Sequence, residues 1–95
     1  MADGRFRVDF APAAERQLAR FSPDVRRRIL RGLHSLEVEP RPHGVRQLSG
    51  TQRAPLWRMR VGDYRVIYEI HDDRLLVLVI RIGHRASVYR DIPGE

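Results

Sequence analysis

The fold of this chain is decided by residues 56–70, which read LWRMRVGDYRVIYEI. Polar and apolar residues alternate on both sides of Gly62-Asp63, and this period of two predicts two strands, Leu56 to Val61 and Tyr64 to Ile70. Glycine in the first position of a two-residue connection is typical of the tight turns that join antiparallel strands. The turn sets a register with four pairs: Val61 with Tyr64, Arg60 with Arg65, Met59 with Val66, and Arg58 with Ile67.

This register sorts the hairpin side chains by face, because residues directly opposite in an antiparallel pair point to the same side. The apolar side is formed by Trp57, Met59, Val61, Tyr64, Val66 and Tyr68. The other side gathers Arg58, Arg60 and Arg65. Convergent guanidiniums suit phosphate, which they bind through paired N–H donors. The same spacing also fits an ordinary surface on which Glu69, diagonal to Arg58, forms an ion pair, and a register error of one residue would move Arg65 to the opposite face.

The sequence on either side of the hairpin predicts further strands. Leu75 to Ile82 is apolar at nearly every position, which is typical of a strand inside a sheet with both faces covered. Arg5 to Phe10 alternates like a half-buried strand. Residues 40–55 are rich in proline and glycine and are predicted to be mostly loop.

Two helices are expected between the first strand and this loop. Pro12 suits the first turn of one helix, and Ser22 followed by Pro23 is a good start for the next, which ends before Pro40. Their buried faces are Ala14, Leu18 and Phe21 in the first and Val25, Ile29, Leu33 and Leu36 in the second. The prediction is an α+β domain over residues 1–95, ordered β-α-α-β-β-β. Its small, antiparallel-dominated sheet has about four strands and carries the N-terminal helical hairpin on one face.

The composition excludes several classes of protein. No apolar run approaches the roughly 20 residues that cross a membrane, and the N-terminus lacks the apolar stretch of a secretion signal. The chain has no cysteine, and its four histidines lack the spacing of metal ligands. We therefore expect a cytoplasmic protein that needs neither a metal nor another cofactor.

The charge of the chain is concentrated in one segment. All 18 basic residues are arginines, and the net charge is +6. Residues 41–65 hold six arginines against Asp63 alone, so this segment carries most of the excess. Such a local surplus indicates an anion-binding patch. A solvated basic loop is the alternative interpretation.

The predicted last strand leads into a second group of polar residues. His84, Arg85 and Tyr89 follow its apolar part and should emerge at the end of the sheet, beside the hairpin. Histidine titrates near neutral pH and can transfer protons, and tyrosine can stack on a base. In the structural alternative, His84 binds the backbone of a turn and Tyr89 packs on the core.

These motifs resemble the RelE family of bacterial toxins. The resemblance covers about residues 5–90 and is carried by Gly-Asp-Tyr-Arg-x-x-Tyr at residues 62–68 and Gly-His-Arg-x-x-Val-Tyr at residues 83–89. Residues 10–20 are similar to the family's first strand and Ala-Glu-Arg-x-Leu helix. The resemblance implies a type II toxin–antitoxin system and an α+β fold like the one above. It also implies metal-independent cleavage of messenger RNA, typically at the ribosome, by attack of a ribose 2′-hydroxyl on the adjacent phosphate.

The resemblance also implies roles by motif position. Arg65 would hold the scissile phosphate, and Arg60 would stabilise developing charge. Arg85 would assist the leaving 5′ oxygen, and Tyr89 would stack on the reacting nucleotide. Contacts to the rest of the RNA are expected from Arg46, Arg58 and Arg81. The implied partners are messenger RNA, the ribosome and an acidic, partly disordered antitoxin, encoded by an adjacent gene, that forms a hetero-oligomer with the toxin.

One departure from the family concerns the general base. Well-studied members carry lysines on the strand that holds Arg58 and Arg60 here, and arginine is a poor base because it cannot readily lose its proton. If a base is needed, His84 is the first candidate and Glu69 the second. The alternative is an enzyme that works mainly by orientation and charge.

Three other functions fit part of the pattern. The related ParE branch shares the fold and poisons DNA gyrase, although its members generally lack the C-terminal pair that Arg85 and Tyr89 match. A catalytically weak homologue that still binds an antitoxin is the second. A basic RNA-binding domain is the third, since an arginine patch alone does not distinguish binding from cutting.

Overall fold

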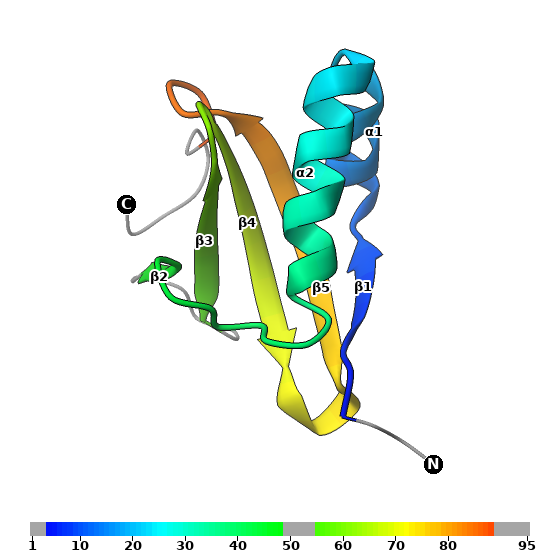
Figure 1. Cartoon of the computed structure of the whole chain (residues 1–95), viewed down its shortest axis with the longest axis vertical. Helices are drawn as coiled ribbons and strands as arrows, with labels where there is room; N and C mark the ends of the chain where they lie inside the picture. The colour runs from blue at the N-terminus through cyan, green and yellow to red at the C-terminus, as the bar shows by residue number, and fades with distance from the viewer. Residues whose placement is uncertain (1–3, 49–54, 89–95) are drawn as a thin grey trace.

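The computed structural model describes residues 4–48 and 55–88, and it confirms the α+β class. Helices α1 and α2 are combined with a five-stranded sheet ordered β1-β5-β4-β3-β2 (Figure 1). Strand β1 runs parallel to β5, and the other neighbours are antiparallel. The elements are β1 (Arg7–Phe10), α1 (Pro12–Arg20), α2 (Pro23–Ser35), β2 (Arg46–Leu48), β3 (Leu56–Val61), β4 (Tyr64–His71), a short 3₁₀ helix η1 (Asp72–Arg74) and β5 (Leu76–His84).

The sheet has one strand more than the sequence predicted. The additional strand, β2, lies within the segment expected to be loop and pairs with β3 over three residues. Prolines and glycines surround it, and its three residues are too few to show an alternating pattern. This strand exists because β3 offers a partner, which is information that the local sequence does not contain.

The predicted register of the central hairpin is confirmed. All four expected pairs are present, including Arg60 opposite Arg65. Gly62 has a φ of +58°, a conformation that residues with a Cβ rarely adopt. Between β4 and β5 the register shifts: Ile67 faces Arg81 and Tyr68 faces Val79. The shift is a β-bulge, and it was not predicted from the sequence.

Helix α2 packs closely across one face of the sheet. Ser22 caps it as predicted, with its hydroxyl accepting a hydrogen bond from the Val25 amide at 3.4 Å. At Gly32 the helix approaches β3 so closely that a Cβ would lie 3.2 Å from Met59 and 3.3 Å from Val61. The main core lies between helices and sheet and includes Ala14, Ile29, Leu33, Leu36, Met59, Val66, Tyr68, Ile70, Val77, Val79 and Ile82.

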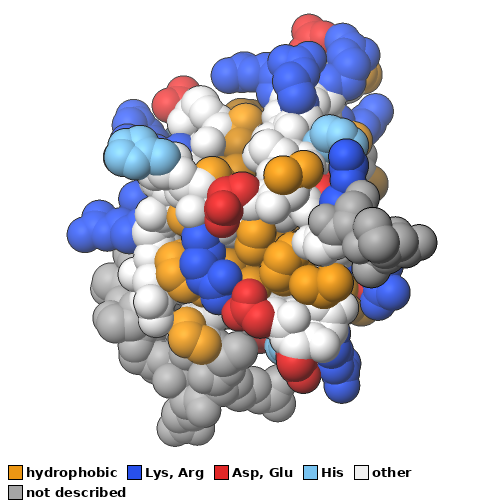
Figure 2. Space-filling view, turned by 60° about the horizontal axis from the view of Figure 1, so that its bottom comes forward, with side chains coloured by type: hydrophobic (Ala, Val, Ile, Leu, Met, Phe, Trp, Pro, Cys, Tyr) orange, Lys and Arg blue, Asp and Glu red, His pale blue; other side chains and the backbone are white. Residues whose placement is uncertain are grey.

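The connection between α2 and β2 is tied to the sheet by polar contacts. The buried Tyr68 hydroxyl donates a hydrogen bond to the Pro40 carbonyl at 2.8 Å, and burial raises the pKa of Tyr68. Arg41 binds Asp72 through two nitrogens, at 3.1 and 2.8 Å, and lies 5.2 Å from the ring centre of Trp57. Figure 2 shows acidic and basic side chains close together on this end of the molecule.

Strand β5 lies inside the sheet, as its apolar sequence predicted, between β1 and β4. Pairing with β1 ends at Phe10, opposite Val79, although β5 continues to His84. Beyond that point the side chain of Gln17 replaces β1 as a hydrogen-bond partner of β5. Its oxygen accepts a hydrogen bond from the Ile82 amide at 2.7 Å. Within the described residues, no helix is long and apolar enough to span a bilayer.

Candidate functional site

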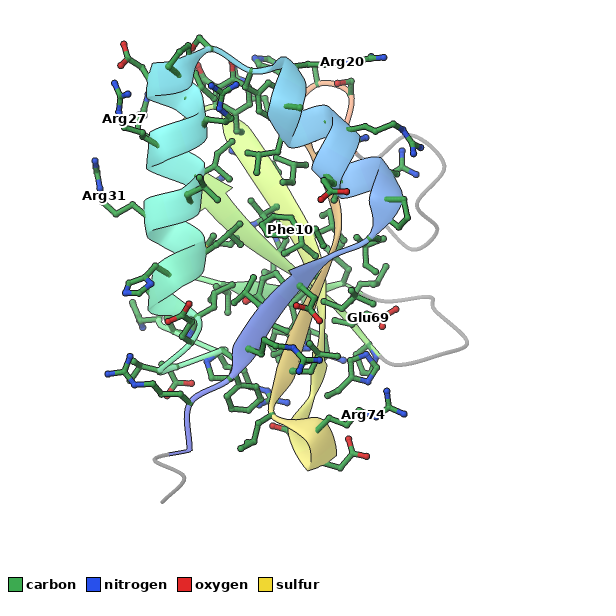
Figure 3. All side chains as sticks on the ribbon, turned by 90° about the vertical axis from the view of Figure 1, so that its right-hand side faces the viewer. Phe10, Arg20, Arg27, Arg31, Glu69 and Arg74 are labelled. Atoms are coloured by element: carbon green, nitrogen blue, oxygen red, sulfur yellow. The ribbon has the colours of Figure 1, made fainter. Side chains whose placement is uncertain are left out.

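The side of the sheet away from α2 carries the predicted arginines. The register places Arg46 opposite Arg58, and Arg60 opposite Arg65. Arg81 lies opposite Ile67, which in turn faces Arg58, so three arginines share one row across four strands. We define the arginine face as Arg46, Arg58, Arg60, Arg65 and Arg81. Glu69 points to the same side of the sheet (Figure 3).

A small apolar floor supports the arginine face. It is a second cluster, separate from the main core, formed by Leu48, Leu56, Ile67 and Val88 with Ile80 packed against it. Val88 packs next to Gly83, where an added Cβ would lie 3.4 Å from the Val88 Cβ. Apolar surroundings strengthen charge interactions because they lower the local dielectric. The floor therefore makes the arginines on this face more effective toward an anion.

Arg65 is held in place by the hairpin turn. It is the one buried charged residue of the described chain, with 8% of its surface exposed. Its Nη1 donates to the carbonyls of Gly62 and Tyr64, at 2.9 Å each. The Nε and Nη2 donors make no hydrogen bond within the described structure, and this is the edge through which a guanidinium binds a phosphate with two parallel bonds.

Some arginines of the described chain have a carboxylate partner, whereas others, such as Arg16, Arg20 and Arg85, have none within the described residues. Away from the arginine face, Arg7 pairs with Asp9, Arg27 with Asp24 and Arg41 with Asp72. On the arginine face, Arg46, Arg60, Arg65 and Arg81 form no ion pair with any carboxylate of the described residues. Their positive charges are therefore not neutralised by the described part of the chain. Such an uncompensated patch attracts anions.

Glu69 has a different partner from Arg58, the one that its diagonal position suggested. Glu69 lies 2.8 Å from Nε2 of His71, and both side chains are partly buried. Glu69 is also four residues from Arg65 along β4, which is about 13 Å of strand. The predicted second candidate for a base therefore shares the arginine face but lies far from the Arg60–Arg65 pair.

His84 emerges at the end of the sheet beside the hairpin, as predicted. It is paired with Tyr64, and the two rings meet edge to face at 5.9 Å. Tyr64 contacts Phe21 and belongs to the core under the helices, so the His84 ring lies on the helix side of the sheet. Its Nδ1 accepts a hydrogen bond from the Ala86 amide at 3.2 Å. In the neutral ring this contact places the hydrogen on Nε2.

Arg85 also lies where the sequence predicted. Its backbone amide donates to the carbonyl of Asp63 at 2.8 Å, which joins the end of β5 to the hairpin turn. The side chain is exposed, and no ion pair with a described residue involves it. Tyr89, predicted to stack on a nucleotide, lies outside the described residues.

One arginine at the hairpin turn was not predicted from the sequence. Arg28 reaches from α2 to Gly62, where an added Cβ would lie 2.7 Å from Nη2 of Arg28. It stands on the helix surface that faces β3, one turn before Gly32, where helix and strand are closest. In the sequence, the position of Arg28 was indicated only by its spacing of four residues from Gly32, which puts both on one side of the helix.

Comparisons with known proteins agree with this architecture. Residues 8–89 match the sequence profile of the family described as ParE toxin of the type II toxin–antitoxin system parDE. The chain is 33% identical over 89 residues to Toxin RelG of Mycobacterium tuberculosis, an alignment that covers 90% of this chain and 97% of that toxin.

Two solved complexes have similar structures. The archaeal RelE–RelB complex of Pyrococcus horikoshii contains a chain that is 30% identical, with a TM-score of 0.76, covering 88% of this chain and 99% of that one. In the toxin–antitoxin complex RelBE2 of M. tuberculosis, the matching chain is 26% identical with a TM-score of 0.74, covering 85% of this chain and 99% of that one.

The fold and these matches together define the class of protein. The chain belongs to the RelE/ParE superfamily of toxins. Within that superfamily it is a RelE-family toxin of a type II toxin–antitoxin system, and an antitoxin is its expected partner.

Proposed function

We propose that this toxin is a metal-independent endoribonuclease that cleaves messenger RNA on the arginine face. The observation that carries the proposal is the set of four arginines, Arg46, Arg60, Arg65 and Arg81, on one face of the sheet without a described carboxylate partner. Phosphates of an RNA backbone match such a surface in charge and geometry.

In the proposed reaction the ribose 2′-hydroxyl loses its proton to water, and its oxygen attacks the adjacent phosphorus. The bond between phosphorus and the 5′ oxygen breaks, leaving a 2′,3′-cyclic phosphate and a 5′-hydroxyl that has gained a proton. Arg65 holds the scissile phosphate through its Nε–Nη2 edge, and Arg60 stabilises the charge that develops. Arg85 assists the leaving oxygen, Tyr89 stacks on the reacting nucleotide, and flanking phosphates are bound by Arg46, Arg58 and Arg81.

The position of His84 favours the version of this mechanism that depends on orientation and charge. A base acting at Nε2 would need that nitrogen free of hydrogen, whereas the Ala86 amide favours the tautomer with hydrogen there. The ring also lies on the helix side of the sheet. Preorganised cations can still supply a large part of a rate enhancement.

The test is cleavage of a single-stranded RNA, and of a message under translation, by the purified toxin. We expect cuts that leave cyclic phosphate ends, persist in EDTA, and disappear when the riboses are 2′-deoxy. More cleavage on translating ribosomes than on free message would indicate ribosome dependence. An uncut message and unaffected translation would contradict the proposal, and inhibition of DNA gyrase in a parallel supercoiling assay would instead support the ParE-like function.

A further inference from the structure

A cavity at the edge of β5 lies beside the arginine face. Its volume is about 290 Å³, and it lies between the end of α1, the end of β5 and the turn that follows β5. The described residues that line it are Gln17, Arg20, Phe21, Arg81, Ile82, Gly83, His84, Ser87 and Val88. Figure 3 shows Arg20 at the end of α1, beside the loop that follows β5.

The cavity is basic on two sides. Arg20 comes from α1 and Arg81 from β5, and none of the described lining residues is acidic. Neither arginine forms an ion pair with a described residue, and the buried Nε of Arg81 has no hydrogen-bond acceptor in the described structure. The Arg81 guanidinium is therefore not held by an internal acceptor at this nitrogen, and its charge is not compensated by a described residue.

The rest of the lining suits a nucleotide better than a lone anion. Phe21, Ile82 and Val88 supply apolar surface, while His84 and Ser87 are polar. Nδ1 of His84 is occupied by the Ala86 amide, so its Nε2–H is the donor left for a ligand. Single-stranded RNA presents this combination of a charged backbone and a flat apolar base.

We propose that this cavity binds a nucleotide of the RNA that continues past the cleaved position, with its phosphate between Arg20 and Arg81. Arg81 connects the two regions, because it belongs to the row that contains Arg46 and Arg58 and also lines the cavity. A strand lying on the arginine face can therefore cross the edge of β5 without leaving basic surface. The inference rests on the proposed RNA substrate and adds Arg20 to the residues that bind it.

The experiment measures binding of a 2′-O-methyl single-stranded RNA to the full chain at several salt concentrations. The 2′-O-methyl group prevents attack by the ribose oxygen, so binding is observed without cleavage. The test variant is Arg20→Ala, and the matched control is Arg16→Ala, one turn earlier on α1. Arg16 is also exposed, has no ion pair with a described residue and does not line the cavity. Arg20→Lys is a second test variant that keeps the charge, and thermal unfolding verifies that each variant folds.

For Arg20→Ala we expect about fivefold weaker binding and a salt dependence reduced by about 0.7 in slope, the value for one lost phosphate contact on a single strand. Arg16→Ala should match the wild type, and Arg20→Lys should restore most of the slope. In a double-mutant cycle, Arg20→Ala and Arg81→Ala should be less than additive. Wild-type binding by Arg20→Ala, or an equal loss of binding in Arg20→Ala and Arg16→Ala, would overturn the cavity site. RNA cleavage by the wild type would in that case leave the proposed function intact.

Discussion

Arg60 on β3 lies directly opposite Arg65 on β4, yet only Arg65 is fastened to the hairpin turn, by two hydrogen bonds from Nη1 to backbone carbonyls. Like charges in facing positions repel. Arg65 offsets this repulsion with its hydrogen bonds, whereas Arg60 is exposed and makes none with a described residue. The two arginines therefore differ in what they contribute to stability, although both are proposed to act on the same phosphate.

Arg65→Ala and Arg60→Ala separate these contributions. Both substitutions should lower RNA cleavage by about 100-fold, the order found when a donor that stabilises transition-state charge is removed. Arg65→Ala should also lower the free energy of unfolding by about 1–2 kcal/mol, since two carbonyls lose their donor. Arg60→Ala should leave it unchanged or raise it by a few tenths of a kcal/mol. Denaturant unfolding and product analysis check both; equal destabilisation by the two variants would contradict the assigned roles.

Tyr68→Phe tests the link between the sheet and the connection that follows α2. The substitution removes the hydroxyl that donates to the Pro40 carbonyl and leaves that acceptor without its partner. We expect a loss of about 1–2 kcal/mol in unfolding free energy, the usual consequence of an unsatisfied buried group. Urea unfolding measures it. Wild-type stability of this variant would show that water satisfies the carbonyl equally well.

The contribution of the Arg41–Asp72 pair to the stability of the fold should decrease in acid. The hydrogen bond from Arg41 lowers the pKa of Asp72. A carboxyl whose pKa is lower in the folded chain stabilises the fold above its unfolded pKa of about 3.9, and that contribution disappears as the pH falls toward the folded value. Asp72→Asn should therefore lower the melting temperature slightly at pH 7, and this effect should shrink as the pH falls below about 3.9. Asp73→Asn is the neighbouring control, and a difference between wild type and Asp72→Asn that grows in acid would be inconsistent with this pair.

His84→Gln and His84→Ala decide whether the reaction needs a titrating base. The orientation-and-charge mechanism predicts that both variants stay within about threefold of the wild-type rate and keep its pH dependence between pH 5 and 8. In that case the arginines would contribute more to the rate enhancement than His84 does. A fall of about 100-fold together with a flattened pH–rate profile would instead establish His84 as the base, the role that its sequence position suggested.

Gly62→Ala should disturb the hairpin for two separate reasons. The positive φ of Gly62 is unfavourable for alanine, and the flexible end of the Arg28 side chain must move to make room for the new Cβ. We expect a loss of about 1–2 kcal/mol in unfolding free energy. Arg28→Ala removes the contact with the new Cβ but not the backbone strain. Gly62→Ala should therefore lower the unfolding free energy less in the Arg28→Ala variant than in the wild type. Full additivity would place Arg28 away from the turn in solution.

The hairpin could be predicted because its determinants are local. Glycine at the turn and the alternation on either side define both strands and their register, and the register alone brings Arg58, Arg60 and Arg65 to one face. Strand β2 could not be predicted, because its three residues become a strand only through pairing with β3.

The limits of prediction at the site have a similar origin. The face on which His84 lies depends on the β-bulge between β4 and β5, and no local pattern in the sequence predicts where that bulge falls. Arg28 reaches the hairpin turn, and Arg20 reaches the cavity at the end of β5, because the helices pack there. Helix packing depends on residues far apart in the chain. The resemblance to the RelE family identified the arginines by motif but offered no position for either helix residue.

The absence of a side chain at Gly32 has a mechanical consequence. With Met59 and Val61 within 3.3 Å of where a Cβ would be, an added methyl group would force these side chains or the helix to move by a few tenths of an ångström. The spacing between helix α2 and the β3–β4 hairpin is therefore sensitive to any side chain added at position 32. The position of the strand that carries Arg58 and Arg60 depends on that spacing.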